Sequence, residues 1–439
     1  MMQIDTMENA YMLVKDGIII EIGTGTRAQL ENQSNWPNLT DSFANYHGIS
    51  NSFEDKTSPE GTSTEKTSPE KRNSEKFTPN DSSSEIEWID LNGAEVMPGL
   101  VDSHTHIVFA APRHEEFALR IQGASYEEIA AAGGGILNSA QKLRETSEDQ
   151  LFEDASKRVQ LMMEWGTTTL EIKSGYGLSV ESELKMLRVI KRLKQTFPIR
   201  IRATFLGAHA FPIEFKQRRD DYIDLILRDM LPAVVADDLA DHIDVFCDEG
   251  FFTPEQTEKI LLKAQQYGLP AKIHGNELGL TGGVQVGVKL NAWSVDHLEH
   301  CSEVEMELFK QSNGNTIPVA LPGTSYFLGI PYAPTRKMID YGLPVALATD
   351  FNPGSSPVAS LQTVCALACT QMKLMPQEVF HAVTCNAARA LRLENEVGCL
   401  AVGMSADFLV MKSRDAVKTI PYYLGQNQVQ QTFCRGNLL

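Results

Sequence analysis

Pro98-Gly-Leu-Val-Asp-Ser-His-Thr-His106 joins a short apolar run to two histidines spaced two residues apart. Side chains alternate between the two faces of a β-strand, so His104 and His106 point to the same side of an extended chain. The pair can then offer two imidazole nitrogens to one point in space. Histidine is the commonest metal ligand but also an ordinary residue, so the motif alone fits half of a metal site or two unrelated histidines.

The length and charge of the chain limit what it can be. Its 439 residues leave room for a barrel of about 250 residues and a smaller module. A net charge of -18 argues against binding to nucleic acid or anionic membranes. No apolar run approaches the roughly 20 residues that span a bilayer, and the N-terminus does not resemble a signal peptide. Seven cysteines without a Cys-x-x-Cys pair indicate reduced thiols. We therefore expect a cytoplasmic enzyme.

The N-terminal part of the chain changes character twice. Residues 8–23 predict a β-hairpin with Lys15-Asp16-Gly17 as its turn. Residues 31–85 are rich in Ser, Thr, Asn, Glu, Lys and Pro, and such a segment buries too little apolar area to offset its ordering entropy. We expect a disordered insertion there; the alternative is a regulatory segment with Ser-Pro and Thr-Pro phosphorylation sites. Residues 1–30 and 86–97 are then the N-terminal part of a small β domain.

Eight apolar runs alternate with helical patterns between residues 98 and 390, the first of them being the run before His104. The other seven runs are 167–172, 201–206, 243–246, 271–273, 293–295, 317–321 and 345–348. Helical periodicity is clear at 180–195, 253–267, 365–375 and 377–391. This alternation predicts an α/β fold, a (β/α)₈ TIM-like barrel, although a proline at position 318 is awkward for a central strand. Residues 391–439 read as strands again, which predicts a small β-sandwich domain built from both chain ends.

Polar residues gather just after the predicted strands, where the active sites of barrels lie. Seven of the ten histidines lie in or near these segments: His104, His106, His114, His209, His274, His297 and His300. With Asp350 after the last strand they offer a mixed nitrogen and oxygen ligand set for zinc or iron. Taken singly, His274 also fits a core histidine and Asp350 a helix cap.

Several motifs resemble a known family. Pro98–His106, a late aspartate after a β-run and Gly403-Met-Ser-Ala-Asp-Phe408 look like the metal-dependent amidohydrolase superfamily. Six longer stretches resemble its imidazolonepropionase family: Gly133-Gly-Gly-Ile136, Glu171-Ile-Lys-Ser-Gly-Tyr-Gly-Leu178, Thr204-Phe-Leu-Gly-Ala-His-Ala210, Lys272-Ile-His274, Leu321-Pro-Gly-Thr324 and Ala348-Thr-Asp-Phe-Asn-Pro-Gly-Ser-Ser356. The resemblance runs from about residue 8 to the end, except for the insertion.

The resemblance implies hydrolysis of 4-imidazolone-5-propanoate to N-formimino-L-glutamate in histidine degradation, with one Zn²⁺ or Fe²⁺/Fe³⁺ ion per subunit and a homodimer. The implied metal ligands are His104, His106, His274 and Asp350. The implied catalytic residues are Glu277, His297 and Asp350. The implied substrate contacts are Arg113, Tyr126, Tyr176, His209, Asn352, Gly354 and Ser355. The family usually has a longer N-terminal segment before the hairpin.

Chemistry supports this allocation. Glu277 lies three residues after His274 and can move protons beside the metal, and His297 can polarise a carbonyl oxygen. Arg113 offers a bidentate fork to the propionate of the substrate, although a surface ion pair with a neighbouring glutamate fits it equally well. Two other hypotheses are another cyclic-amide hydrolase or deaminase of the superfamily, and a scaffold without activity. The retained ligands disfavour the scaffold.

Overall fold

The computed structural model describes residues 6–25, 87–123, 128 and 134–439. The chain divides into two units, one made of residues 1–23 and 93–439 and the other of residues 24–92. The predicted insertion at 31–85 and the predicted substrate contact Tyr126 lie outside the described residues.

Eight parallel strands form one sheet in which each strand pairs with its neighbour in sequence. They are β4 (Leu100–Asp102), β5 (Thr167–Lys173), β6 (Arg200–Ala208), β7 (His242–Cys247), β8 (Ala271–Gly275), β9 (Ser294–His297), β10 (Ile317–Ala320) and β11 (Ala346–Leu347). The first and last strands meet just beyond their ends, where Thr105 forms a parallel bridge with Phe351 and Asp350 N donates to the His104 carbonyl at 3.0 Å. The predicted (β/α)₈ barrel is confirmed, and its closure lies within the His-x-His motif.

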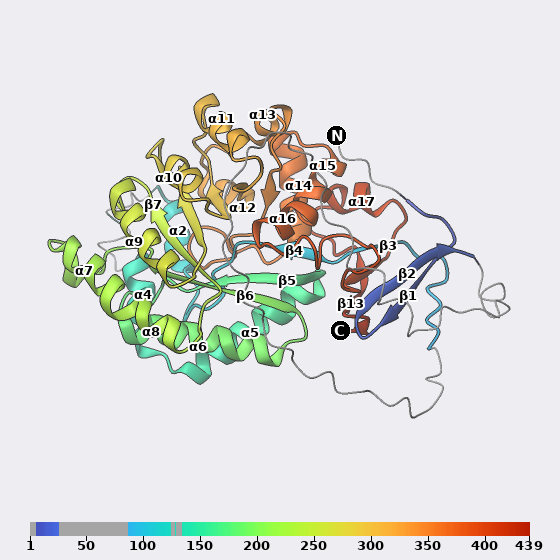
Figure 1. Cartoon of the computed structure of the whole chain (residues 1–439), viewed down its shortest axis with the longest axis horizontal. Helices are drawn as coiled ribbons and strands as arrows, with labels where there is room; N and C mark the ends of the chain where they lie inside the picture. The colour runs from blue at the N-terminus through green and yellow to red at the C-terminus, as the bar shows by residue number, and fades with distance from the viewer. Residues whose placement is uncertain (1–5, 26–86, 124–127, 129–133) are drawn as a thin grey trace, which may run out of the picture. The chain divides into compact units, whose positions relative to one another are not determined.

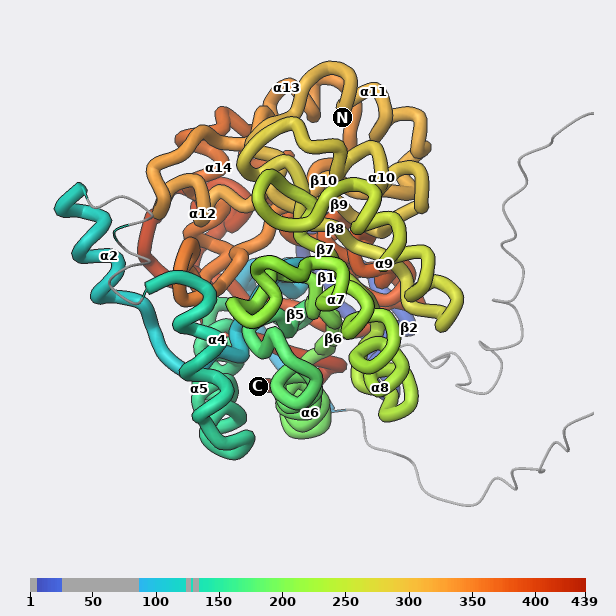
Figure 2. The backbone as a smooth tube through the Cα atoms, turned by 90° about the vertical axis from the view of Figure 1, so that its left-hand side faces the viewer, coloured from blue at the N-terminus to red at the C-terminus, as the bar shows by residue number. Residues whose placement is uncertain are grey.

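Helices surround the strands, as the tube view in Figure 2 shows. They are α2 (His114–Ile121), α4 (Ile136–Glu145), α5 (Glu148–Glu164), α6 (Val180–Thr196), α7 (Arg219–Leu225), α8 (Leu231–Ala236), α9 (Pro254–Gln266), α10 (Gly283–Lys289), α11 (Glu303–Gln311), α12 (Pro322–Leu328), α13 (Thr335–Asp340), α14 (Leu361–Met372), α15 (Pro376–Ala382), α16 (Cys385–Ala390) and α17 (Ala416–Tyr422). In α6, Met186, Ile190 and Leu193 are fully buried, because residues at this spacing share one face of a helix. Burying such a side chain stabilises the fold by about 1.5–3 kcal/mol.

The helix predicted at 377–391 is two helices, α15 and α16. The break falls at Val383 and Thr384, where Thr384 has φ -128° and ψ -93°. The carbonyl oxygen of Val383 accepts a hydrogen bond of 3.0 Å from Val101 N of β4. The helix therefore ends where its backbone hydrogen-bonds to a barrel strand. The periodicity of the sequence cannot predict such a tertiary contact.

Pro318 lies inside β10 and is compatible with the sheet. Ile317 N donates to the Trp293 carbonyl on the β9 side, so the nitrogen of the next residue faces β11. Pairing with β11 begins one residue later, at Val319 and Ala346. The missing N–H of proline therefore costs no ladder hydrogen bond.

Strands from both chain ends form two small sheets (Figure 1). The hairpin of β1 (Ala10–Lys15) and β2 (Ile18–Thr24) turns at Asp16 and Gly17, whose positive φ angles of 52° and 80° suit a tight turn. The second sheet is antiparallel and contains β3 (Val96–Pro98), β12 (Phe408–Met411), β13 (Val429–Cys434) and β14 (Asn437–Leu438). Ile19 N joins the hairpin to the Met404 carbonyl at 2.9 Å. Both ends thus contribute to the small β module, as predicted.

All seven cysteines are free thiols, as predicted. Within the described ranges, none of the helices has the length and apolar character required to cross a bilayer.

Candidate metal centre

The four predicted metal ligands converge at the carboxyl ends of the strands. His104 Nε2 lies 3.1 Å from His106 Nε2, which lies 3.3 Å from His274 Nε2. Asp350 Oδ1 is 3.4 Å from the Nε2 atoms of both His104 and His106. All four residues are buried. The barrel thus brings together side chains that are up to 246 positions apart, from 104 to 350.

Two further carboxylates hold the ligand imidazoles from behind. Asp296 Oδ2 lies 2.6 Å from His104 Nδ1, and Asp244 Oδ2 lies 2.9 Å from His274 Nδ1. A carboxylate at Nδ1 favours the proton on that atom and leaves the Nε2 lone pair facing the centre. Burial lowers the pKa of His104 well below its ordinary value, and that of His274 to about 4. Neutral imidazole lone pairs beside a carboxylate repel one another without a cation, so this donor set fits a metal ion.

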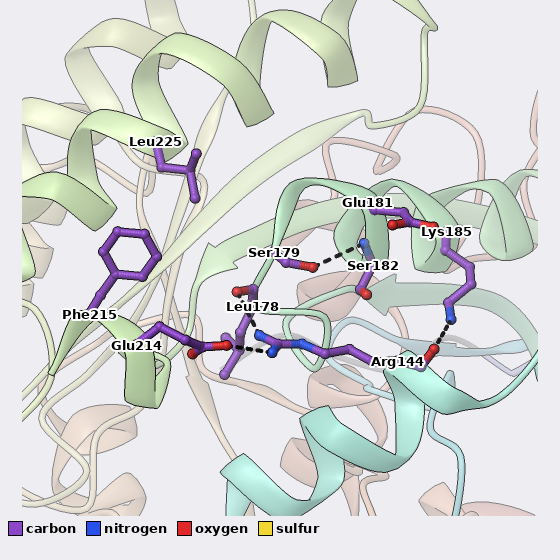
Figure 3. A pocket seen from close by; sticks show the side chains of 9 residues that line it. All are labelled: Arg144, Leu178, Ser179, Glu181, Ser182, Lys185, Glu214, Phe215 and Leu225. Atoms are coloured by element: carbon purple, nitrogen blue, oxygen red, sulfur yellow. Dashed lines mark hydrogen bonds and ion pairs between the residues drawn. The ribbon is translucent and has the colours of Figure 1, made fainter.

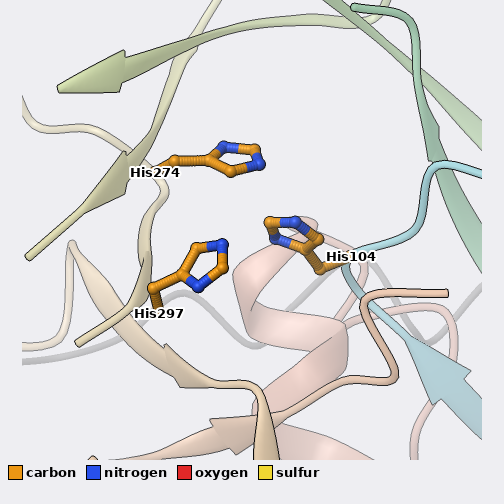
Figure 4. Close-up of side chains that lie close together, drawn as sticks. All are labelled: His104, His274 and His297. Atoms are coloured by element: carbon orange, nitrogen blue, oxygen red, sulfur yellow. The ribbon is translucent and has the colours of Figure 1, made fainter. Parts of the chain in front are cut away.

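His297 lies beside the same centre and forms a second possible donor group with His104 and His274 (Figure 4). Its Nδ1 is 3.5 Å from Glu277 Oε2 and 3.6 Å from Glu299 Oε2. Burial alone would lower the pKa of His297, but these carboxylates overcome it and raise the pKa to about 10. A protonated imidazole cannot ligate a metal, so this environment suits hydrogen-bond donation better than ligation.

The backbone at His297 is unusual. Its φ is 85°, and that of Leu298 is 67°. Non-glycine residues rarely occupy this region, and where they do the surrounding structure holds them there. Two consecutive positive φ angles turn the chain sharply at the end of β9 and keep the imidazole beside the donor group.

Asp350 is held by its neighbours on one oxygen. Thr324 Oγ1 donates to Oδ2 at 2.6 Å and Asn352 Nδ2 donates to it at 2.8 Å, which leaves Oδ1 facing the imidazoles. The alternative of a helix cap is wrong, because the next helix, α14, begins at Leu361 with Ser360 as its N-cap.

Glu277 sits in the segment after β8, where Asp248 fixes the backbone. Asp248 Oδ2 accepts hydrogen bonds from Glu277 N at 2.7 Å and from Leu278 N at 2.9 Å. The Glu277 side chain is 14% exposed. Burial raises the pKa of Glu277 to about 7. A carboxylate that titrates near neutrality can both accept and return a proton.

His209 and Tyr176 form an aromatic wall against the centre. The His209 ring stacks on His106 at 5.4 Å between centroids and 13° between planes, and Tyr176 lies 6.0 Å from His106 and 5.6 Å from His209. His209 Nδ1 hydrogen-bonds to the Gly175 carbonyl at 3.0 Å. Since burial lowers the pKa of His209 to about 3, the ring is neutral and Nδ1 is the donor.

The segment that carries Tyr176 is clamped from two sides. Glu183 accepts hydrogen bonds from Gly175 N, Gly177 N and Leu178 N at 2.7–3.0 Å. Arg144 donates to the carbonyls of Gly177 and Leu178 at 3.3 and 3.2 Å. A cavity of about 260 Å³ beside Arg144 (Figure 3) is lined by none of the predicted ligand or substrate residues. This neighbourhood therefore positions Tyr176 and is separate from the metal centre.

Arg113 lies between Glu116 and Gly354, and its contact with the substrate stays a prediction. It donates to Glu116 through Nε at 2.9 Å and Nη2 at 2.5 Å, the ion pair that was the alternative. It also lies across Gly354, where an added Cβ would stand 2.1 Å from Arg113 Nη1. Any side chain at position 354 would require the guanidinium of Arg113 to move. Asn352 Oδ1 accepts from Gly354 N and Ser355 N at 2.8 Å each, so the predicted substrate contacts at 352–355 form one ordered turn beside Arg113.

Two of the seven histidines are not brought to the centre, because His114 and His300 are exposed. The barrel interior also holds charged residues that the predicted site does not include, all with side chains at 0% exposure: Glu171, Lys173, Asp244, Lys272 and Asp296. The available signal was charge at alternate positions of apolar strands, where side chains point into the barrel. Burial alone would lower the pKa of Lys173, but Asp244 and Glu171 overcome it and raise that pKa, so its ammonium is charged.

Comparison with known proteins agrees with the geometry. Residues 96–439 match the model of the amidohydrolase family. The chain is 50% identical over 351 residues to imidazolonepropionase of Flavobacterium johnsoniae, a match that covers 80% of this chain and 85% of the relative. It is 47% identical to imidazolonepropionase of Christiangramia forsetii with the same coverage. That of Alkaliphilus oremlandii is 43% identical over 348 residues, 79% of this chain and 82% of the relative.

Solved structures show the same fold at low identity. A 5-methylcytosine deaminase from Klebsiella pneumoniae superimposes with a TM-score of 0.66 at 15% identity, covering 99% of this chain and 94% of the other. A guanine deaminase from C. acetobutylicum gives the same TM-score and identity, covering 98% and 94%. The chain therefore belongs to the amidohydrolase family and, within it, to the imidazolonepropionases.

Proposed function

We propose that this chain hydrolyses 4-imidazolone-5-propanoate to N-formimino-L-glutamate, a step of histidine degradation. The observation that carries the proposal is the position of Glu277 and His297 beside four converging metal donors. The names of relatives that are 43–50% identical over 348–351 residues support the choice of substrate.

We propose that His104, His106, His274 and Asp350 hold one Zn²⁺ or Fe²⁺/Fe³⁺ ion per subunit. When bound, such an ion lowers the pKa of water to about 7 and polarises a carbonyl group. The three imidazoles are buried, and burial lowers their pKa values. They are therefore unprotonated and ready to ligate at neutral pH.

The reaction needs one proton to move. Water oxygen bonds to the ring carbonyl carbon, the carbon–nitrogen bond of the cyclic amide breaks, and the departing nitrogen takes a proton. Glu277 accepts the proton of the attacking water and returns it to that nitrogen. His297 donates a hydrogen bond to the carbonyl oxygen while negative charge develops on it. Asp350 assists by holding the centre at its carboxylate.

The substrate carries a propionate, which requires a cation. Arg113 provides a planar guanidinium next to the turn that contains Asn352, Gly354 and Ser355. Tyr176 and His209 face the ring from the wall described above. Tyr126 belongs to the same proposed set by resemblance.

Arg113→Ala tests the choice of substrate. A charge-assisted hydrogen bond is worth about 1.5–3 kcal/mol, so we expect KM for 4-imidazolone-5-propanoate to rise roughly 10- to 150-fold. An imidazolone without the propionate should be a poor substrate of the parent, and the variant should handle it no worse. Steady-state kinetics on both compounds measure this.

Arg336→Ala is the matched control, because it removes another bidentate arginine, paired with Glu378 at a distance from the proposed set. Its KM should stay within about twofold. If the parent prefers a ring without a carboxylate, a different cyclic-amide hydrolase or a deaminase of the family is the better assignment.

Three further predictions come from the sequence: the homodimer from the family resemblance, the location from charge and cysteine content, and the domain bounds from the pattern of strands and helices. We propose a homodimer and a cytoplasmic location. We also propose that residues 98–390 form the catalytic barrel domain, and that 1–30, 86–97 and 391–439 form the small β domain. Sedimentation at several protein concentrations tests the dimer.

A further inference from the structure

Five charged side chains fill the barrel interior behind the metal donors, with none of their surface exposed. They are Glu171, Lys173, Asp244, Lys272 and Asp296. Buried charges are costly unless they are paired and hydrogen-bonded. Three carboxylates and two ammonium groups share this space. Each ammonium group must therefore neutralise more than one carboxylate.

Lys173 is shared by the two carboxylates that hold ligand imidazoles. Its Nζ donates to Asp244 Oδ2 at 2.8 Å and lies 3.6 Å from Asp296 Oδ2. The same Asp244 oxygen is 2.9 Å from His274 Nδ1, and the same Asp296 oxygen is 2.6 Å from His104 Nδ1. One ammonium group therefore touches both supports of the metal centre.

Asp244 is held on both oxygens. Its Oδ1 accepts a hydrogen bond from His274 N at 3.0 Å, so the carboxylate grips the backbone and the ring of the same ligand. Without the ammonium of Lys173, Asp244 would be a buried anion beside the carboxylates of Glu171 and Asp296. It would then move away from them, and this movement loosens its hold on His274.

Lys272 provides a natural comparison. It is equally buried and pairs with Glu171 Oε2 at 2.8 Å, as Lys173 does at 3.0 Å. Its other hydrogen bond goes to the Ser103 carbonyl at 2.9 Å, and it stands 3.8 Å from Asp296 Oδ2. The two lysines thus differ in the direct contact with Asp244.

We propose that Lys173 is a positioning residue of the metal centre, which acts through Asp244 to hold His274 in the orientation that binds the ion. The proposal rests on the metal site proposed above. It assigns Lys173 no contact with the substrate, and it predicts an effect on metal affinity that does not depend on turnover.

The test compares two double variants with equal net charge. Lys173→Met/Glu171→Gln and Lys272→Met/Glu171→Gln each remove one buried cation and one buried anion. Competition against a chromophoric chelator gives the Zn²⁺ affinity of each folded apoprotein. We expect the Lys173 variant to bind Zn²⁺ about 10- to 100-fold more weakly than the parent, the range typical of outer-shell partners. The Lys272 variant should stay within about threefold. Equal affinities in the two variants would overturn the proposal.

The parent protein separates this inference from the function. If the parent binds neither Zn²⁺ nor Fe²⁺, the proposed metal site is wrong; if the parent binds Zn²⁺ and both variants match it, only the role of Lys173 is wrong. If the Lys173→Met/Glu171→Gln variant does not fold, Asp244→Asn is compared with the double variant Lys173→Met/Asp244→Asn. This double variant also removes one buried cation together with one buried anion. If Lys173 acts through Asp244, removing it from the Asp244→Asn variant should change the Zn²⁺ affinity by less than about threefold. A larger further loss would contradict the proposed route.

Discussion

Glu277→Gln is expected to lower kcat for 4-imidazolone-5-propanoate by about 10³-fold, within the 10²- to 10⁴-fold range of general acid–base catalysis. Glutamine keeps the shape of the side chain but can neither accept a proton from water nor return it to the ring nitrogen. KM should change little, because the proposed partner of the propionate, Arg113, is unchanged. Metal analysis should show that the variant still binds its ion, since Glu277 is not among the proposed ligands.

The pH dependence of kcat/KM is a second test of the role of Glu277. Burial raises the pKa of Glu277 to about 7, and the base must be deprotonated to act. The kcat/KM of the parent should therefore rise with pH up to about 7, and Glu277→Gln should lack this rising limb. Glu249→Gln is the matched control, because Glu249 is an exposed glutamate in the neighbouring segment. If Glu277→Gln stays within tenfold of the parent, its proton-transfer role is wrong.

Removal of the metal is expected to abolish turnover, with a loss of at least about 10³-fold. Water at neutral pH is a poor nucleophile, and a bound ion brings its pKa from 15.7 to about 7. The apoprotein should also unfold at a lower temperature, because a ligand that binds only the native state stabilises it. Activity and the unfolding midpoint are measured after dialysis against a chelator, and both should return on addition of Zn²⁺ or Fe²⁺.

A chelator already saturated with Zn²⁺ serves as the control and should leave both properties unchanged. Asp350→Asn should behave as the chelated protein does at low Zn²⁺ and recover in part at high Zn²⁺, because it removes one charged ligand. A chelated sample with full activity would contradict the metal mechanism.

The barrel and the centre of the site follow from simple periodicities. Strands of alternating or continuous apolar residues predict β4 to β11 in order, and a spacing of two places His104 and His106 on one face. The rule that barrel sites lie at strand ends then adds His274 and Asp350, which the structure brings within 3.3–3.4 Å of His106. These features are local or depend on one rule about the fold, so they can be predicted from a single sequence.

What the sequence did not predict depends on contacts between distant elements. The helical pattern at 377–391 is continuous, yet the helix breaks at Val383, whose carbonyl oxygen accepts a hydrogen bond from β4. Asp244 lies inside one apolar run and Lys173 directly follows another. Their ion pair joins β7 to β5 across the intervening strand β6, so it exists only in the folded barrel. Arg113 has a local partner in Glu116 and a distant neighbour in Gly354. Sequence spacing predicts the ion pair with Glu116 but not the contact with Gly354.

Hydrolysis in water labelled with oxygen-18 follows the proposed bond change itself. Zinc-loaded protein and 4-imidazolone-5-propanoate should give N-formimino-L-glutamate with one labelled oxygen in the carboxylate formed from the ring carbonyl, as mass spectrometry of the product would show. Asp350→Asn and chelated samples should give far less labelled product. Ammonia released from the ring, or unchanged substrate with fully metal-loaded protein, would contradict the assignment.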